Sequence, residues 1–427
     1  MEVYLQKYTS VSSVILLNTK SENWIRIKKD HYDKLTKSDI KKIVVDYGLT
    51  DLAKNKRGIT SIYLFVTHQC NLACDFCFLK SNPAIKPEYY FDAKKIMEYL
   101  SPFLLLSTNI KVVVTGGEPL LNSDIEEILQ RLSEAIGKEN IILQTNGILL
   151  NKEKISKISN HVNCIEMSVE NVVKDKKFRE GMEKKYSLLK SVGCNMLFSY
   201  VVDDMSCEEL TNAIELADKY DAYFQMRFVE PLGNGLLNYG ADQWKHQYEL
   251  MKRCHITFLD YLIENKGYDR KYSKVMNNVL TPRENCGGYG EVVAIHPNGD
   301  VFPCGNILNK EMRVSNINES NYFDDAQDYY EEENVKSRFL VESKNDCLNC
   351  DYLFFCNGMC GAVERNFEGY NVYKEGICKF RKEMLFFEMF IRDKNWSQEE
   401  YYYKLRTYLC EEQCERLVKR DVERIFI

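Results

Sequence analysis

The sequence feature that most constrains the fold is a regular alternation of short strand-like runs with helical segments between residues 61 and 228. Six runs have the composition of buried strands: SIYLFVT, IKVVVT, NIILQ, CIEMS, MLFSYV and YFQMRFV. The stretches between them, such as FDAKKIMEYLSPF and SDIEEILQRLSEAI, have helical periodicity. Because parallel neighbours need a crossover connection, this order predicts an α/β fold with a parallel sheet. The six strand–helix units form either a partial (β/α)6 barrel or an open sheet, and in both cases the chemistry lies at the carboxyl ends of the strands.

Three further segments flank this region. Residues 1–57 contain two short strand-like runs, SSVILL and WIRIK, and then two helical stretches, which predicts a small α+β unit. The alternation stops after Thr281, and residues 282–381 predict short strands and turns with seven cysteines, including a hairpin whose turn is Asn298-Gly299. Residues 382–427 predict a charged helical tail. The predicted division is therefore 1–57, 58–281, 282–381 and 382–427.

The composition excludes several classes of protein. The net charge is −6, and the basic residues are scattered among acidic ones, which does not favour nucleic acid as a partner. No apolar run approaches the ~20 residues of a membrane-spanning helix. The first twenty residues lack the basic start and continuous apolar stretch of a secretory signal. We expect a cytoplasmic protein with neither a membrane nor a nucleic acid as its partner.

The 16 cysteines indicate metal or redox chemistry, because disulfides are disfavoured in the cytoplasm. Cys70, Cys74 and Cys77 form a C-x3-C-x2-C motif directly after the first strand-like run. Three thiolates can hold three irons of a [4Fe–4S] cluster and leave the fourth iron without a protein ligand. A closed zinc site needs four ligands, and His68 is the only nearby nitrogen, but zinc stays an alternative at this point.

The motif resembles that of the radical S-adenosylmethionine (SAM) enzymes, with Phe76 as the aromatic residue before the last cysteine. The resemblance implies that the open iron of the cluster binds the amino and carboxylate groups of SAM. It also implies that SAM is split into methionine and a 5′-deoxyadenosyl radical. The second strand-like run ends in TGGEP, which resembles the family's GGEP motif, and this implies that Gly116, Gly117 and Glu118 meet the methionine ammonium.

Two further segments resemble SAM contacts of the family. LQTNG (143–147) and EMSVEN (166–171) end the third and fourth strand-like runs, although the second motif departs from the family's usual SLDG. The resemblance implies that Ser168, Glu170 and Arg179 hold the ribose and carboxylate of SAM. The segment RFVEPLG (227–233) resembles the family's last SAM-proximal segment.

The second cysteine group has the pattern C…G-x4-C…C-x2-C-x5-C-x3-C…C, which resembles the SPASM extension of radical SAM enzymes with its two auxiliary [4Fe–4S] clusters. The resemblance implies a total of three clusters. One auxiliary cluster would lie on Cys286, Cys304 and Cys360, and the other on Cys347, Cys350, Cys356 and Cys378. The first of these sets lacks a fourth cysteine, which leaves either an open iron or an outside ligand such as Cys254. A zinc ribbon is the alternative for Cys347 to Cys360. Six cysteines remain, and most are expected to be small core residues: Cys164, Cys194, Cys207, Cys254, Cys410 and Cys414. Cys410 and Cys414 lie at i, i+4 on the predicted helical tail and are expected to be structural, because two ligands alone do not make a cluster site.

The resemblance covers residues 59–381 and predicts a radical SAM oxidoreductase that acts on a peptide. We expect it to install an oxidative cross-link, a Cys thioether, in a short ribosomal precursor peptide, with a flavodoxin or ferredoxin as its reductant. Residues 1–57 resemble a leader-peptide recognition domain, or else they only cap the barrel. One alternative is a formylglycine-generating sulfatase-maturing enzyme, although Gly305 stands where such relatives carry an Asp base. The non-enzymatic alternative is an iron–sulfur electron carrier or scaffold. The sequence identifies no general base.

Overall fold

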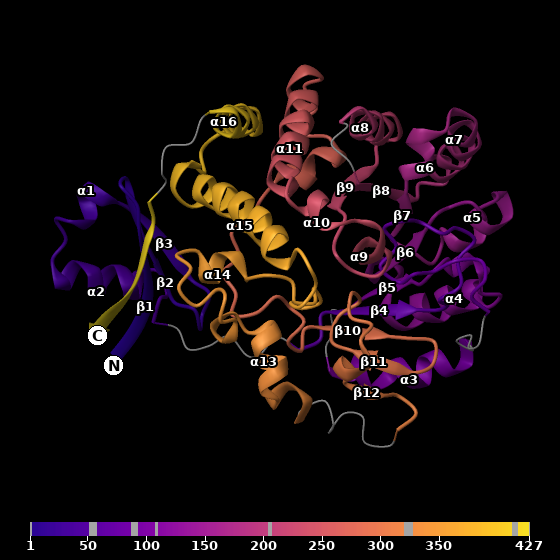
Figure 1. Cartoon of the computed structure of the whole chain (residues 1–427), viewed down its shortest axis with the longest axis horizontal. Helices are drawn as coiled ribbons and strands as arrows, with labels where there is room; N and C mark the ends of the chain where they lie inside the picture. The colour runs from indigo at the N-terminus through magenta and orange to yellow at the C-terminus, as the bar shows by residue number, and fades with distance from the viewer. Residues whose placement is uncertain are drawn as a thin grey trace.

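The computed structural model describes residues 2–50, 58–86, 93–106, 110–203, 207–319, 328–411 and 417–426. Figure 1 shows a large sheet with helices along its outer side, a small sheet that contains both ends of the chain, and the cysteine-rich segment (residues 282–381) between the two. The arrangement therefore places the second cysteine group next to both sheets.

The six predicted strands form the centre of the large sheet. They are β4 (Ser61–Phe65), β5 (Lys111–Thr115), β6 (Ile141–Thr145), β7 (Cys164–Ser168), β8 (Asn195–Val202) and β9 (Tyr223–Phe228), parallel and in sequential order. The connecting helices are α3 (Ala93–Leu106), α4 (Ile125–Ile136), α5 (Lys152–Ile158), α6 (Glu170–Lys174), α7 (Lys176–Ser191) and α8 (Glu208–Tyr220). The prediction of an α/β fold with a parallel sheet is confirmed.

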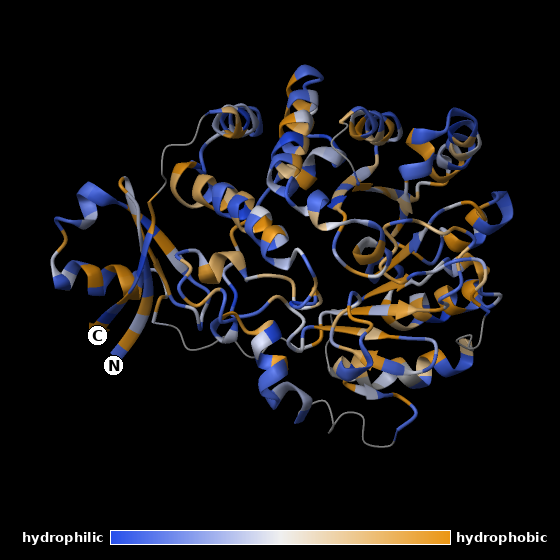
Figure 2. Cartoon of the chain, viewed as in Figure 1, coloured by the Kyte–Doolittle hydropathy of each residue, from blue (hydrophilic) through white to orange (hydrophobic). Residues whose placement is uncertain are grey.

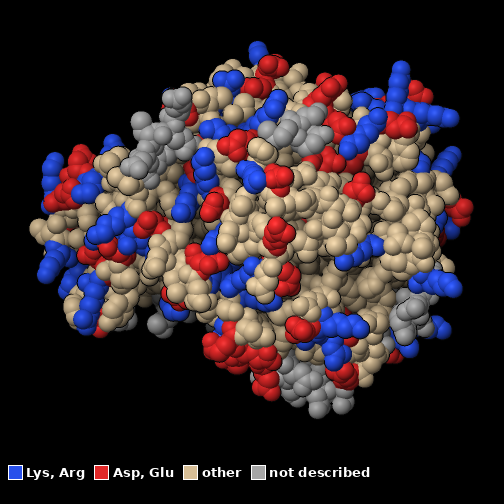
Figure 3. Space-filling view, viewed as in Figure 1, with Lys and Arg blue, Asp and Glu red and all other residues tan. Residues whose placement is uncertain are grey.

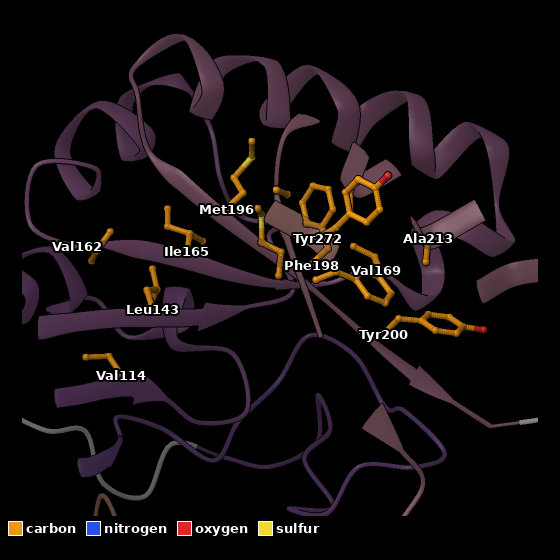
Figure 4. Packing of buried hydrophobic residues seen from close by; sticks show 14 of the residues in the cluster. Val114, Leu143, Val162, Ile165, Val169, Met196, Phe198, Tyr200, Ala213 and Tyr272 are labelled. Carbon is orange, nitrogen blue, oxygen red and sulfur yellow. The ribbon is translucent and has the colours of Figure 1, made fainter. Parts of the chain in front are cut away.

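The two faces of these strands differ in polarity. Alternate side chains of these strands point toward the helices and pack into the main hydrophobic core, as Leu143, Ile165 and Phe198 do (Figure 4). The strands are accordingly among the most hydrophobic elements of the chain (Figure 2). On the opposite face, the same strands carry polar side chains such as Glu166 and Ser199, which line a cavity. A polar face on an otherwise buried parallel sheet marks the place where a ligand can bind.

Three strands extend the sheet beyond the prediction. β10 (Val292–Ile295) pairs in parallel with β4, and β11 (Asp300–Phe302) and β12 (Ser315–Asn316) continue from it in antiparallel orientation. The predicted hairpin is confirmed, and Gly299 in its turn has a φ of 86°. The described strands thus form a nine-stranded sheet in which the cysteine-rich segment continues the β4 edge of the parallel strands.

The end of the chain differs from the predicted helical tail. α15 (Tyr370–Phe386) spans the boundary expected at residue 381 and continues into a π-helical turn, η6 (Phe387–Ile391), and α16 (Gln398–Cys410) follows. The last element is a strand, β13 (Lys419–Phe426), so the prediction of a wholly helical tail is wrong there. β13 is an edge strand, and Ile425 is the one buried residue among those described in it. The other residues of β13 are mostly charged, so the sequence shows no strand pattern there.

β13 completes a second sheet with the start of the chain. It pairs antiparallel with β1 (Glu2–Thr9), and β2 (Ser13–Leu17) and β3 (Trp24–Lys28) follow in the order β13-β1-β2-β3. The predicted α+β unit is present, with α1 (Lys29–Tyr32) and α2 (Lys37–Asp46), but β1 was not expected. One face of this sheet packs on α2, and the other packs on Phe354 and Phe355 of the cysteine-rich segment. Residues 51–57 lie outside the described part of the chain.

The surface carries charges of both signs without one dominant patch on the face drawn in Figure 3. Among the described residues, no helix is long and apolar enough to cross a membrane.

Candidate active site

The loop that carries Cys70, Cys74 and Cys77 (residues 66–80, the cysteine loop) follows β4 and is held from two sides. On one side, α9 (Asn234–Asn238) follows the RFVEPLG segment. The backbone amide of Asn234 donates to Cys77 O over 2.9 Å, and its side-chain amide donates to Cys74 O over 2.9 Å. The side chain of Asn238 donates to Asp75 O over 2.9 Å. These two asparagines fix the loop backbone, and no sequence pattern singled them out.

On the other side, the GGEP motif packs directly against the cysteine loop. Gly117 N donates to Thr67 O and Glu118 N donates to Gln69 O, each over 2.8 Å. A Cβ at Gly116 would lie 2.3 Å from Thr67 O, and one at Gly117 would lie 2.2 Å from Gln69 O. Only glycine allows this approach. The two glycines therefore position the cysteine loop, besides forming part of the cavity wall.

A cavity of about 850 Å³ lies at the carboxyl ends of the parallel strands, within the range of roughly 300–1,000 Å³ that is typical of ligand sites. Its wall contains most of the residues that the sequence predicted: Cys70, Cys74, Cys77, Phe76, Gly116, Gly117, Ser168 and Glu170. The structure thus brings these residues together around one space. Glu118 and Arg179 are not part of the wall.

Glu118 instead lies behind the wall as a fully buried carboxylate. Its Oε1 accepts hydrogen bonds from Thr145 Oγ1 over 2.6 Å and from Leu120 N over 3.0 Å, and its Oε2 accepts one from Asn146 N over 2.8 Å. Burial raises the pKa of Glu118, although these donors oppose that shift. The carboxylate ties the end of β5 to the end of β6 and so supports the two motifs that end there.

The other two predicted contacts differ in their placement. Glu170 is buried on the cavity wall and accepts a hydrogen bond from Val201 N over 2.8 Å, and its burial raises its pKa to about 7. Arg179 lies on α7, where its Nε is 3.3 Å from a carboxylate oxygen of Glu183 one turn later. An i, i+4 pair on one helix explains why the Arg179 side chain does not face the cavity.

The inner face of the sheet adds polar groups that were not predicted. Glu166 accepts from Gln144 Nε2 over 2.9 Å and pairs with Arg227 over 2.9 Å. Arg227 Nε also donates to Ser199 Oγ over 3.1 Å. These side chains come from β6 to β9 and form a connected polar floor beneath the cavity. Their period-2 spacing within apolar strands was the available signal.

The cysteine-rich segment and α15 close the cavity. Tyr373, Ile377 and Arg381 of α15 form part of its wall, as does Glu230 from the RFVEPLG segment. Burial raises the pKa of Glu230, while the charges of Arg381 and Arg227 oppose this shift. Residues from both cysteine-containing regions of the chain therefore border the same space.

The second cysteine group forms two sets of thiols. Cys360 interacts electrostatically with Cys304 and Cys286, and Cys378 interacts with the set Cys347, Cys350 and Cys356. Cys304 and Cys360 pack on one hydrophobic cluster, whereas the fully buried Cys254 of α11 (Gln247–Glu264) belongs to the main core. The structure thus places Cys254 in a different packing environment from the set for which it was one candidate outside ligand.

The donor chemistry of the three thiol groups fits iron–sulfur clusters better than zinc. No three Cys, His, Asp or Glu side chains of the described residues are arranged to hold one metal ion, as a zinc site requires. In a [4Fe–4S] cluster each thiolate binds a different iron, so the sulfurs need not converge on one point. Burial raises the pKa of Cys70, and raises that of Cys74 and Cys360 to about 12, so metal binding must displace protons from them.

The cysteines outside these groups have no common role. Cys164 is buried, as expected for a core residue, and Cys194 and Cys207 are half-buried. Cys410, the last residue of α16, is exposed. Cys414 lies outside the described residues.

Comparison with known proteins identifies the central region. Residues 64–219 match the family model of the Radical SAM superfamily. The radical SAM cyclopropyl synthase TigE of Paramaledivibacter caminithermalis is 24% identical over 378 residues, which cover 79% of this chain and 75% of that protein. The GTP 3′,8-cyclase of Aquifex aeolicus is 39% identical over 112 residues. The chain covers only 32% of that cyclase and 63% of the cyclase of Limosilactobacillus fermentum.

Two solved structures share the fold over most of the chain. Streptococcus suis SuiB bound to S-adenosylmethionine has a TM-score of 0.52 at 15% identity, covering 83% of this chain and 94% of that one. The structure of anSMEcpe with bound AdoMet has a TM-score of 0.56 at 16% identity, covering 76% of this chain and 96% of that one. At this level of identity the similarity concerns the fold alone.

Proposed function

We propose, from the premise that this chain is an enzyme with a radical SAM domain, that it is a peptide maturase that installs an oxidative cross-link. The observation that carries the proposal is the shared cavity, because the cysteine loop and the cysteine-rich segment both border it. Its volume of about 850 Å³ is near the upper end of the range for small-molecule sites, which leaves room for part of a second molecule beside SAM.

We assign three [4Fe–4S] clusters to the three thiol groups. Cys70, Cys74 and Cys77 would hold the cluster that binds SAM. The two sets in the cysteine-rich segment would hold the auxiliary clusters. When bound, the first cluster would pass one electron from an external reductant to SAM, and the cleavage of SAM into methionine and a 5′-deoxyadenosyl radical would supply the group that takes a hydrogen atom from the peptide. An auxiliary cluster would accept the electron that leaves the peptide afterwards.

The protein's own residues position the reactants. Ser168 and Glu170 line the wall beside the cysteine loop, where they would orient the ribose of SAM. The polar floor formed by Gln144, Glu166 and Arg227 offers both donors and acceptors to a polar ligand. Arg179 pairs with Glu183 and would need to change its rotamer to reach SAM.

Loss of two hydrogens from a peptide also requires a proton acceptor, and we assign that role to Glu230. Its carboxylate lies on the cavity wall and interacts electrostatically with Cys304 and Cys360. A carboxylate whose pKa is raised by burial is a stronger base than an exposed one. The variant Glu230→Gln should release 5′-deoxyadenosine but form no cross-linked peptide. Product formation at the wild-type rate would exclude Glu230 as the base.

The product that fits best is a Cys thioether or another ring-forming bond. The relative TigE is by name a cyclopropyl synthase, which is consistent with an oxidative ring closure. Formylglycine formation fits less well because Gly305 provides no carboxylate at the position where such relatives carry an Asp base. An electron carrier would need neither the GGEP motif nor a ligand cavity beside the cysteine loop.

The test is co-expression with a candidate substrate. The peptide encoded by the short cysteine-containing reading frame nearest to the gene should lose two hydrogen atoms per cross-link, as measured by mass spectrometry. Its Cys→Ser version should stay unmodified if the product is a thioether. An unchanged peptide together with full release of 5′-deoxyadenosine would contradict the proposal for that peptide class.

A further inference from the structure

One short turn joins the two auxiliary thiol sets. Residues 356–360 (the linking turn) begin with Cys356, which belongs to one set, and end with Cys360, which belongs to the other. All three carbonyls between these cysteines accept hydrogen bonds from two cationic side chains. Lys344 Nζ donates to the carbonyls of residues 357 and 359 over 3.3 and 2.7 Å. Arg381 Nη1 donates to the carbonyl of Gly358 over 2.8 Å.

Lys344 is an unusual residue to find in this place. Only 1% of it is exposed, although a lysine ammonium is strongly hydrated and is rarely buried without a charged partner. The side chain passes over Gly358, where a Cβ would lie 2.9 Å from Cδ and 3.2 Å from Nζ of the lysine. Gly358 also has a φ of 70°, which favours glycine. The turn is therefore shaped around the lysine.

Lys344 interacts electrostatically with cysteines of both sets. No Asp or Glu among the described residues forms an ion pair with it. Burial lowers the pKa of Lys344, whereas Cys286, Cys347 and Cys360 favour its charged form and Arg365 opposes it. Cys286 and Cys360 belong to one set and Cys347 to the other. A buried ammonium next to thiolates that ligate metal clusters would compensate negative charge at both sites.

We propose that Lys344 is a cation built between the two auxiliary cluster sites, and that it raises the reduction potentials of both clusters. The inference rests on the proposed assignment of clusters to these thiols. The potential of a cluster depends on its net charge, on the hydrogen bonds around it and on burial. Because adding an electron makes a cluster more negative, a nearby cation favours the reduced form, and burial strengthens this effect. Lys344 would make both clusters better acceptors for an electron from the substrate.

Arg381 provides an internal comparison. It is half-buried on the cavity wall, and its cysteine partners are Cys356 and Cys378, which belong to one set only. Replacing Arg381 should therefore lower the potential of the Cys347–Cys378 cluster and leave the other nearly unchanged. Replacing Lys344 should lower both. If Lys344 and Arg381 only held the linking turn in place, their replacement would not change the two reduction potentials in these different ways.

The experiment is a redox titration followed by electron paramagnetic resonance. All variants carry Cys70→Ala, Cys74→Ala and Cys77→Ala, so that only auxiliary clusters contribute to the signal. Lys344→Met and Lys344→Gln remove the charge, and the glutamine keeps a hydrogen-bond donor for the turn. Lys344→Arg keeps the charge, and Lys310→Met, which changes an exposed lysine of the same segment, is the matched control.

We expect both neutral variants to shift the two midpoint potentials to more negative values, while Lys344→Arg and Lys310→Met keep those of the parent. Loss of auxiliary iron in both neutral variants, with retention in Lys344→Arg, would also support the role of the charge. Unchanged potentials in an iron-replete neutral variant would overturn the inference, and so would an arginine variant that behaves like the methionine variant. Fewer than about eight auxiliary irons per chain in the parent would instead contradict the cluster assignment itself.

Discussion

The buried carboxylate of Glu118 gives the sharpest prediction about the candidate site. The sequence places this residue in a motif that contacts a ligand, whereas the structure gives it three hydrogen bonds from Thr145, Asn146 and Leu120. In Glu118→Ala the buried amide of Leu120 and the part-buried amide of Asn146 lose their acceptor, and the Thr145 hydroxyl can rotate. At about 1–3 kcal/mol for each unsatisfied amide, the free energy of unfolding should fall by about 2–6 kcal/mol.

Urea unfolding of the anaerobic protein, followed by circular dichroism, measures this loss. Glu118→Gln should cost less, about 1–3 kcal/mol, because the amide group still provides one acceptor oxygen. Glu134→Ala, at an exposed position of α4, is the matched control and should stay within about 0.5 kcal/mol of the wild type. The reasoning would be refuted if Glu118→Ala kept wild-type stability and lost only its affinity for SAM. Glu118 would then act as a ligand contact and not as a support.

Three further perturbations test other parts of the site. Burial raises the pKa of Glu170 from 4.5 to about 7, so the cost of its charge to folding grows as the pH rises from about 4.5 to 7. Glu170→Gln should therefore stabilise the protein by up to about 3 kcal/mol at pH ~8 and have little effect at pH ~4.5. Urea unfolding at both pH values measures the difference. Gly117→Ala places a Cβ 2.2 Å from Gln69 O and should displace the cysteine loop and its iron. The control Gly181→Ala on α7 meets no atom within 4 Å, so it should leave the stability of the protein unchanged or raise it by up to ~1 kcal/mol. Asn234→Ala removes the side-chain bond to the cysteine loop and should lower its iron content, measured after reconstitution, with the auxiliary iron unchanged.

The central sheet could be predicted because β4 to β9 are buried on the helix side and carry their own signal in near-continuous apolar runs. β13 could not, because an edge strand that buries little beyond Ile425 has the composition of an exposed helix. The parallel pairing of β10 with β4 joins residues more than 200 positions apart, and no local pattern encodes such a contact.

The same contrast between local sequence motifs and tertiary contacts applies to the candidate site. The cysteine loop and the GGEP glycines are contiguous motifs, and both line the cavity as expected. Asn234 and Arg381 reach the site only through tertiary packing, and each looks like an ordinary polar residue in the sequence. Glu230 lies in the RFVEPLG segment that was expected near the ligand, but no pattern singled out its carboxylate. The contact of Glu118 with SAM stays a prediction, because its carboxylate lies behind the cavity wall and a motif specifies a backbone path more securely than the direction of one carboxylate.

The most direct test of the account pairs an iron count with SAM cleavage in the wild type and the Cys70→Ala, Cys74→Ala, Cys77→Ala variant. After anaerobic reconstitution the wild type should hold about twelve irons per chain and release 5′-deoxyadenosine under dithionite. The variant should hold about eight irons and release none. A variant that still cleaves SAM, or a wild type with about four irons and stoichiometric zinc, would contradict the assignment of the three thiol groups.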